Sequence, residues 1–78
     1  MARKARRTHS EQIAGRCIDE AKAMLGPGWG HLSSEIQWGL VAARIVGVIQ
    51  TQDESTPPES VIRYFNELVD SARAEMGI

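Results

Sequence analysis

The segment from Ile36 to Ile49 is the feature that most limits how this 78-residue chain can fold. Only two of its side chains, those of Gln37 and Arg44, are strongly polar. The segment is too short to span a bilayer and it carries a charge, so we expect it to belong to the core of a soluble protein. A helix that is apolar around nearly its whole circumference must be buried around nearly its whole circumference. This segment is therefore predicted to lie at the centre of the fold.

Three segments have the spacing of apolar residues that is typical of helices, and no segment alternates as a strand does. The predicted helices span about residues 10–25, 33–51 and 57–76. Residues 10–78 are therefore expected to form one all-α domain, a small three-helix bundle, behind a flexible N-terminal arm of residues 1–9. The chain has two tryptophans, one tyrosine and one phenylalanine, so its core must be mostly aliphatic.

Local signals mark both ends of the first predicted helix. Thr8 and Glu11 stand three residues apart, which is the spacing of a capping box. Gly26 and Pro27 end the helix, because glycine accepts a left-handed conformation and proline cannot continue the hydrogen-bond ladder. The sequence Gly-Pro-Gly-Trp-Gly at positions 26–30 then predicts a loop, since it disfavours both helix and strand.

Similar signals mark the second and third predicted helices. Either Ser33 or Ser34 can cap the second helix. Thr56 is expected to cap the third, because Pro57 follows it at the position that a first helical residue would occupy. Gly77 is expected to end the third helix.

The second predicted helix has more apolar surface than two neighbouring helices can cover. An exposed apolar patch is rare on soluble monomers unless it binds something. A second copy of the chain is the simplest cover, because closed twofold dimers are the commonest oligomers. We therefore predict a homodimer. The residues expected at its interface are Trp29, Trp38, Val41, Ile45, Ile49, Gly39, Ala43 and Gly47.

Two parts of this predicted interface have alternative roles. Gly39, Ala43 and Gly47 repeat every four residues and form a shallow groove, into which either another helix of the same chain or a second copy can pack. Trp29 is either an exposed binding anchor, a role in which tryptophan is enriched, or a side chain that closes one end of the core. Trp38 is expected in the core or at the dimer interface.

The charge of the chain is divided between its two parts. Residues 1–9 hold Arg3, Lys4, Arg6 and Arg7 and no acid, which is a formal charge of +4. Residues 10–78 hold the other five basic residues and all ten acidic residues, which is a formal charge of −5. A dense positive segment can bind phosphates regardless of sequence, or it can simply keep the chain soluble. The first alternative makes these four basic residues the predicted nucleic-acid contacts.

The residue types that most often carry catalysis or bind metals do not converge in this sequence. Cys17 lies on the apolar face of the first predicted helix, where a thiol packs as a small apolar group. His9 and His31 have no second ligand at metal-site spacing. We therefore expect no enzymatic activity, no cofactor and no metal. Because Cys17 has no partner for an internal disulfide, a reducing cytoplasm is the expected location.

Two functions remain as hypotheses. In the first, the chain is a small regulatory or accessory protein, a helical homodimer whose basic arm contacts nucleic acid. In the alternative, it is a protein-interaction module, of the phage or plasmid inhibitor or adaptor type, that binds a protein partner through its acidic helical body. Neither hypothesis involves a membrane.

Overall fold

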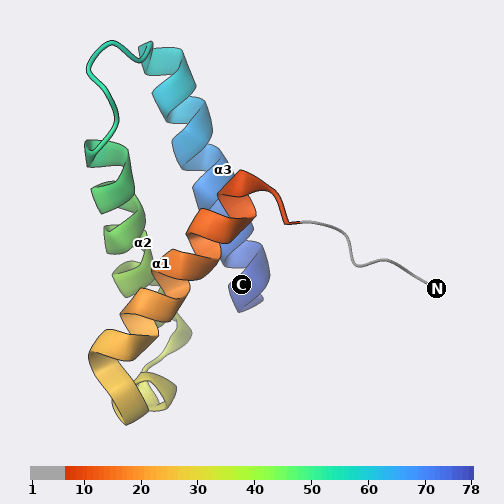
Figure 1. The fold of residues 1–78 in the computed structure, drawn as a ribbon. Helices are drawn as coiled ribbons and strands as arrows, with labels where there is room; N and C mark the ends of the chain where they lie inside the picture. Colours follow the sequence, from red (N-terminus) through yellow and green to blue (C-terminus); the bar gives the residue numbers. More distant parts are fainter. Residues whose placement is uncertain (1–6) are drawn as a thin grey trace, which may run out of the picture.

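The computed structural model describes residues 7–78, and in this part of the chain three α-helices and one short 3₁₀-helix form the whole regular structure (Figure 1). The helices are α1 (His9–Leu25), η1 (Gly26–His31), α2 (Ser34–Gln50) and α3 (Pro58–Met76). The chain runs down α1, up α2 and down α3 in the view of Figure 1. No strand occurs within residues 7–78, so the prediction of an all-α domain with three helices is confirmed.

The start of α1 is the predicted capping box. The Thr8 hydroxyl accepts a hydrogen bond from the Glu11 N–H at 3.1 Å, and the Glu11 carboxylate accepts one from the Thr8 N–H at 2.8 Å. These two bonds satisfy backbone donors that have no partner inside the helix. At the other end, Gly26 has a φ of 56° and its N–H donates to the Lys22 carbonyl. The predicted capping residues therefore set both ends of α1.

Residues 26–31 differ from the predicted loop, because they form the 3₁₀-helix η1. Pro27 lies at the start of this element, where its fixed φ suits a helix and its missing N–H has no bond to make. The element makes i→i+3 bonds over about two turns, and short 3₁₀ pieces of this kind often connect α-helices. The Leu32 N–H donates to the Trp29 carbonyl at 3.2 Å and closes it.

The other helix ends agree with the sequence signals at two positions and differ at a third. Ser33 caps α2, and its hydroxyl accepts a bond from the Ile36 N–H at 3.3 Å. Gly77 ends α3 in the left-handed conformation, with a φ of 76°. Thr56 does not cap α3, which is a correction.

The reason for this difference is the pair of prolines. A residue that precedes a proline is disfavoured in the helical region, and Pro57 is extended, with a ψ of 141°. Helix α3 therefore begins at Pro58, and Pro57 is the N-cap residue without a side-chain acceptor. Thr56 instead donates its N–H to the Asp53 carbonyl at 2.9 Å, in the turn before the helix.

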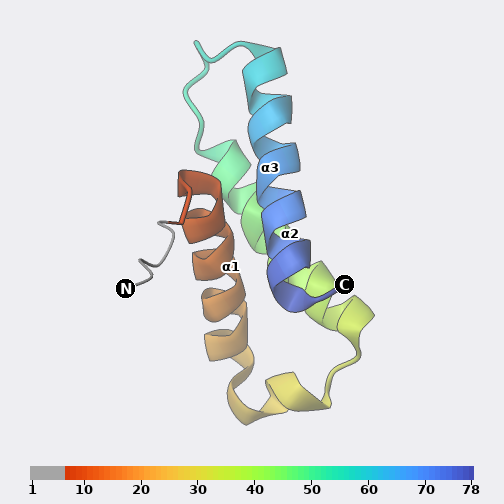
Figure 2. The same cartoon turned by 90° about the vertical axis from the view of Figure 1, so that its right-hand side faces the viewer.

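The core lies where the three α-helices meet, and each of them contacts both others (Figures 1 and 2). Its buried side chains are aliphatic or small, as the low aromatic content predicts. They are Ala14, Cys17, Ile18 and Ala21 of α1, Val41 and Ile45 of α2, and Leu68 and Ala72 of α3. Burial of each large aliphatic side chain contributes about 1.5–3 kcal/mol. Alanines on α1 and α3 let the helices approach closely.

Three polar residues, Gln37 and Arg44 of α2 and Thr51 at its C-terminal end, make bonds within the chain. The Gln37 side-chain amide donates to the Trp29 carbonyl at 2.8 Å. The Arg44 guanidinium pairs with the Glu20 carboxylate of α1 at 3.1 Å. The Thr51 hydroxyl donates to the Val48 carbonyl at 2.7 Å. Gln37 and Arg44 therefore mark the side of α2 that lies next to η1 and α1.

Candidate interaction surfaces

One side of α2 is apolar and exposed to solvent. The exposed apolar and glycine residues of this side are Ile36, Gly39, Ala43, Val46 and Gly47, which we call the α2 outer face. The exposed polar residue Gln50 lies at the C-terminal end of the same side. The residues of the α2 outer face recur at three- and four-residue intervals, so they lie on one side of the helix. Ile36 is 53% exposed and Val46 is 43% exposed. None of the five residues is polar, and the half-buried Leu40 continues the face on one edge.

The groove predicted along this face is open. A Cβ atom added at Gly39 or at Gly47 would meet no atom within 4 Å. Within residues 7–78, no other helix of the same chain therefore packs into the groove. The other predicted occupant is a second copy of the chain. Large apolar patches on soluble proteins usually mark an interaction site. The α2 outer face is thus the main candidate surface for a partner.

The predicted interface residues divide between two sides of α2. Val41 and Ile45 are 0% exposed, because they point between α1 and α3 into the core. Ile49 is half-buried and packs against the same core. This burial revises the predicted interface: these three residues hold the monomer together, and the groove of Gly39, Ala43 and Gly47 is what the monomer leaves accessible.

Both tryptophans pack against the core and are half-buried. The Arg73 guanidinium lies over the Trp38 ring, with its central carbon 5.6 Å from the ring centroid. This cation–π contact joins α2 and α3. Trp29 lies in η1, and its carbonyl is bonded by Gln37. Of its two predicted roles, Trp29 therefore closes one end of the core.

The basic arm is only partly described. Arg3, Lys4 and Arg6 lie outside residues 7–78. Arg7 is described, and it makes contacts within the chain. Its Nη2 atom lies 3.2 Å from both carboxylate oxygens of Glu75 on α3, and it donates to the Glu11 carbonyl at 3.2 Å. Arg7 thus links the start of α1 to the end of α3.

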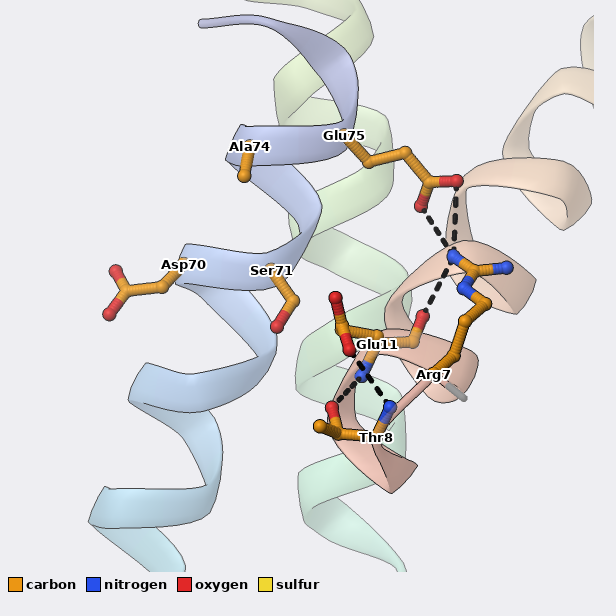
Figure 3. Close-up of a pocket in the computed structure, with 7 residues that line it drawn as sticks. All are labelled: Arg7, Thr8, Glu11, Asp70, Ser71, Ala74 and Glu75. Atoms are coloured by element: carbon orange, nitrogen blue, oxygen red, sulfur yellow. Dashed lines mark hydrogen bonds and ion pairs between the residues drawn. The ribbon is translucent and has the colours of Figure 1, made fainter. Parts of the chain in front are cut away.

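Arg7 and Glu75 border an open hollow of about 750 Å³ between α1 and α3 (Figure 3). The hollow is lined by Arg7, Thr8, Glu11, Asp70, Ser71, Ala74 and Glu75. Its three carboxylates do not converge: Glu11 accepts the Thr8 N–H, Glu75 faces Arg7, and Asp70 points away from both (Figure 3). This arrangement is an acidic surface with one bound cationic side chain, and it has none of the geometry of a paired acid and base.

Hydrogen bonds shift the pKa of Glu11, which lines this hollow. Donation by the Thr8 backbone N–H, and then the bond with the Thr8 side chain, lower the pKa of Glu11 below its usual range. The nearby positive charge of Arg7 acts in the same direction. The charged form of Glu11 is therefore favoured, and a carboxylate accepts the Thr8 N–H more strongly than a neutral carboxyl group does.

Two residues with catalytic or metal-binding potential, Cys17 and His9, are buried in the core or hydrogen-bonded. Cys17 is buried in the core, and this burial raises the pKa of its thiol. A thiol held in the neutral form is a poor nucleophile. The His9 Nε2 lies 3.0 Å from the Tyr64 hydroxyl, and the two rings stack. Within residues 7–78 no three His, Cys, Asp or Glu residues are grouped closely enough to hold a metal ion.

Comparison with protein-family models, with curated proteins and with solved structures found no match to this chain. Among the helices of residues 7–78, none combines the length and the apolar content needed to cross a bilayer.

Two parts of these surfaces were not predicted from the sequence. The Arg7–Glu75 contact joins residues at opposite ends of the sequence, and no spacing rule connects them. Ile36 and Val46 were recognised as apolar but not as the exposed side of α2. The available signal for the second was Arg44. A charged residue in an otherwise apolar helix is expected to pair with an acidic residue of a neighbouring helix, which leaves the opposite side of α2 free.

Proposed function

We propose that this chain is a non-catalytic accessory protein of the cytoplasm that dimerises through the α2 outer face and contacts nucleic acid with its basic N-terminal arm. The observation that carries the proposal is the open apolar face of α2. The buried thiol of Cys17, with its raised pKa, supports a role in binding over a role in covalent catalysis.

The composition of the α2 outer face suits a second copy of the same helix. A twofold interface brings the same surface of both copies together, so that surface must fit itself. Gly39, Ala43 and Gly47 allow two helix backbones to approach closely, while Ile36 and Val46 supply side chains that can fill the grooves of the partner helix. In an antiparallel pair centred on Ala43, Gly39 of each copy faces Gly47 of the other. None of the five residues of this face is charged.

The arm supports the nucleic-acid part of the proposal through its charge. Four basic residues in the first nine carry +4, and a dimer would present two such arms. Phosphate contacts of this kind are independent of base sequence and weaken steeply with added salt. The acidic body would repel the backbone elsewhere, which favours contact through the arms alone.

The first experiment measures the solution mass of the purified chain by light scattering. The expected result is twice the 8.6 kDa chain mass. Ala43→Glu places a charge at the centre of the α2 outer face and is expected to give a folded monomer, since Ala43 is exposed in the single chain. Ala23→Glu makes the same change at an exposed position of α1 and is expected to leave the dimer intact. A wild-type monomer, or a dimer that survives Ala43→Glu, would overturn the proposed interface.

The second experiment adds a short DNA duplex and follows its fluorescence anisotropy at several salt concentrations. Wild-type protein is expected to bind at low salt and to lose affinity steeply as salt rises. Deletion of residues 1–6 removes Arg3, Lys4 and Arg6 but leaves the Thr8–Glu11 cap, so the domain should stay folded. Unchanged duplex affinity in this deletion variant would exclude Arg3, Lys4 and Arg6 as the contacts.

A second candidate function is that of a protein-interaction module, and the acidic hollow between α1 and α3 favours it. Glu11, Asp70 and Glu75 line that hollow, and such a surface suits a basic segment of another protein. This candidate predicts no duplex binding at physiological salt. It also predicts a specific protein partner whose binding is weakened by Asp70→Asn. Partner binding that is insensitive to that change and to Ala43→Glu would count against it.

A further inference from the structure

Arg7 is the one basic residue of the arm whose surroundings the structure describes, and it is held at a defined place. Its Nη2 atom contacts both oxygens of the Glu75 carboxylate and the backbone carbonyl of Glu11, each at 3.2 Å. The side chains of Arg7 and Glu75 are 52% and 43% exposed. The pair therefore lies at the surface, where a phosphate group could reach it.

The missing side chain of Gly15 makes room for this guanidinium. Gly15 is buried in α1, and a Cβ atom added there would lie 2.8 Å from Nη2 and 3.3 Å from Nη1 of Arg7. Real Cβ atoms do not come so close to another atom, so an alanine would push the end of the Arg7 side chain away. The Arg7 guanidinium is thus held next to Gly15, the Glu11 carbonyl and the Glu75 carboxylate.

We propose that Glu75 competes with nucleic acid for Arg7, so that the Arg7–Glu75 ion pair limits the affinity of the arm. This inference rests on the proposed function, because it concerns the same phosphate contacts. While the pair is closed, the Arg7 guanidinium is neutralised within the chain and cannot release a phosphate counterion. When the pair is open, Arg7 joins the other basic residues of the arm.

The pair is weak enough to be opened by a change at either partner. Exposed ion pairs contribute between nothing and about 1 kcal/mol, which is up to about fivefold in an equilibrium constant. Removal of the Glu75 charge is therefore expected to raise duplex affinity at low salt by about two- to fivefold. Salt also screens the ion pair in wild type, so the slope of log K against log salt should be more negative in the variant by part of the about 0.9 that one full phosphate contact contributes. The slope change is specific, since a merely structural role for the pair would not produce it.

The experiment compares duplex binding by wild type, Glu75→Gln and Asp70→Asn across a salt series. Asp70 is the matched control, because it lines the same hollow and makes no ion pair within residues 7–78. Both variants remove one negative charge from the same surface, but only Glu75→Gln frees Arg7. The expected result is the larger affinity and the steeper slope in Glu75→Gln alone.

Two further variants test whether the effect passes through Arg7. In the Arg7→Gln background, Glu75→Gln should have no more effect than Asp70→Asn. Gly15→Ala keeps every charge but displaces the guanidinium, so it should raise the affinity as Glu75→Gln does. This alanine also favours the helix, so a change in its binding cannot be attributed to unfolding. Circular dichroism spectra identify any variant that fails to fold.

The outcomes separate the two proposals. If wild type binds the duplex and Glu75→Gln matches Asp70→Asn in affinity and slope, the competition is overturned while the proposed function stands. An equal effect of Glu75→Gln with and without Arg7 would overturn the competition in the same way. If neither wild type nor Glu75→Gln binds at low salt, the nucleic-acid function fails and the inference that rests on it fails too.

Discussion

Thr8 and Thr56 lie one and two residues before a helix, but only Thr8 bonds to the helix that follows. The Thr8 hydroxyl accepts the Glu11 N–H of α1, whereas the prolines at 57 and 58 separate Thr56 from α3. Thr8→Ala should therefore lower the free energy of unfolding by about 1 kcal/mol, the usual contribution of an N-cap hydroxyl. Urea unfolding monitored by circular dichroism measures this loss.

Thr56→Ala is the control for this prediction. It removes the same hydroxyl from a residue whose side chain caps no helix, so we expect a change within about 0.5 kcal/mol. Equal losses in the two variants would show that the capping bond of Thr8 does not contribute to stability.

Glu11 makes the stability of the domain depend on pH in the acid range. Its pKa is lowered in the folded state, mainly by the bond from the Thr8 N–H. A lowered folded-state pKa means that its contribution is fully present above the pKa of an unfolded glutamate, about 4.3, and is lost as the pH falls through the lower folded value. Urea unfolding at a series of pH values between about 6 and 2 should show this loss. Glu11→Gln should flatten that part of the curve, and a curve parallel to that of wild type would contradict the assignment.

Ile45 and Ile62 are the same residue type in opposite surroundings. Ile45 is 0% exposed in the core, while Ile62 on α3 is 61% exposed. Ile45→Val should cost about 0.5–1.5 kcal/mol, because it removes a buried methyl group and leaves a cavity. Ile62→Val should change stability by less than about 0.5 kcal/mol. Similar losses at both positions in urea unfolding would contradict the described core. Ile45→Asp would place a charge in this core and unfold the monomer. This variant therefore cannot show whether Ile45 contributes to a dimer interface.

At the scale of the helices, local signals predicted most of the ends. The Thr8–Glu11 box, Ser33 and Gly77 each act through bonds to residues a few positions away, and such bonds depend little on the rest of the fold. Pro57 and Pro58 gave conflicting signals, since either could be a first helical residue, and the effect of the second proline on the first decided between them. The short element η1 was missed because its glycines and proline suit a loop and a 3₁₀-helix equally.

Hydrophobic periodicity could not predict the orientation of α2, because its two sides are almost equally apolar. One side carries Val41 and Ile45 and the other carries Ile36 and Val46, so hydrophobic periodicity alone does not choose between them. The choice is made by α1 and α3, which pack where the larger side chains interdigitate. The groove was predicted from spacing alone, but its openness is a property of the tertiary structure.

The glycines of α2 allow a test of what the open groove is for. A Cβ atom at Gly39 meets nothing in the single chain, so Gly39→Ala should stabilise the monomer by about 0.5–1 kcal/mol through helix propensity. If two α2 helices approach closely at this position, the same change should weaken the dimer. Unfolding of a dilute sample and sedimentation of a concentrated one measure the two effects. A tighter dimer in Gly39→Ala would contradict close approach of the backbones.

At the scale of the whole molecule, charge and apolar surface lie in different places. The arm is basic, the hollow between α1 and α3 is acidic, and the α2 outer face carries no charge. The separation means that self-association and polyanion binding can be removed by different substitutions. Charge totals for the two parts of the chain were available from the sequence, but the contact of Arg7 with the acidic body required the fold.

The contact between Arg7 and Glu75 joins positions that are 68 residues apart in sequence, so the described chain is almost a closed ring. A short glycine–serine linker from Ile78 to Arg7 would complete that ring with little disturbance of the helices. New ends could then be opened among Asp53, Glu54 and Ser55, which are exposed between α2 and α3, and exposed turns of this kind tolerate cleavage best. The resulting circular permutant would begin with α3 and end with α2. Because the same side chains would still meet in the core, the order in which the three helices are connected should matter little to the domain they form.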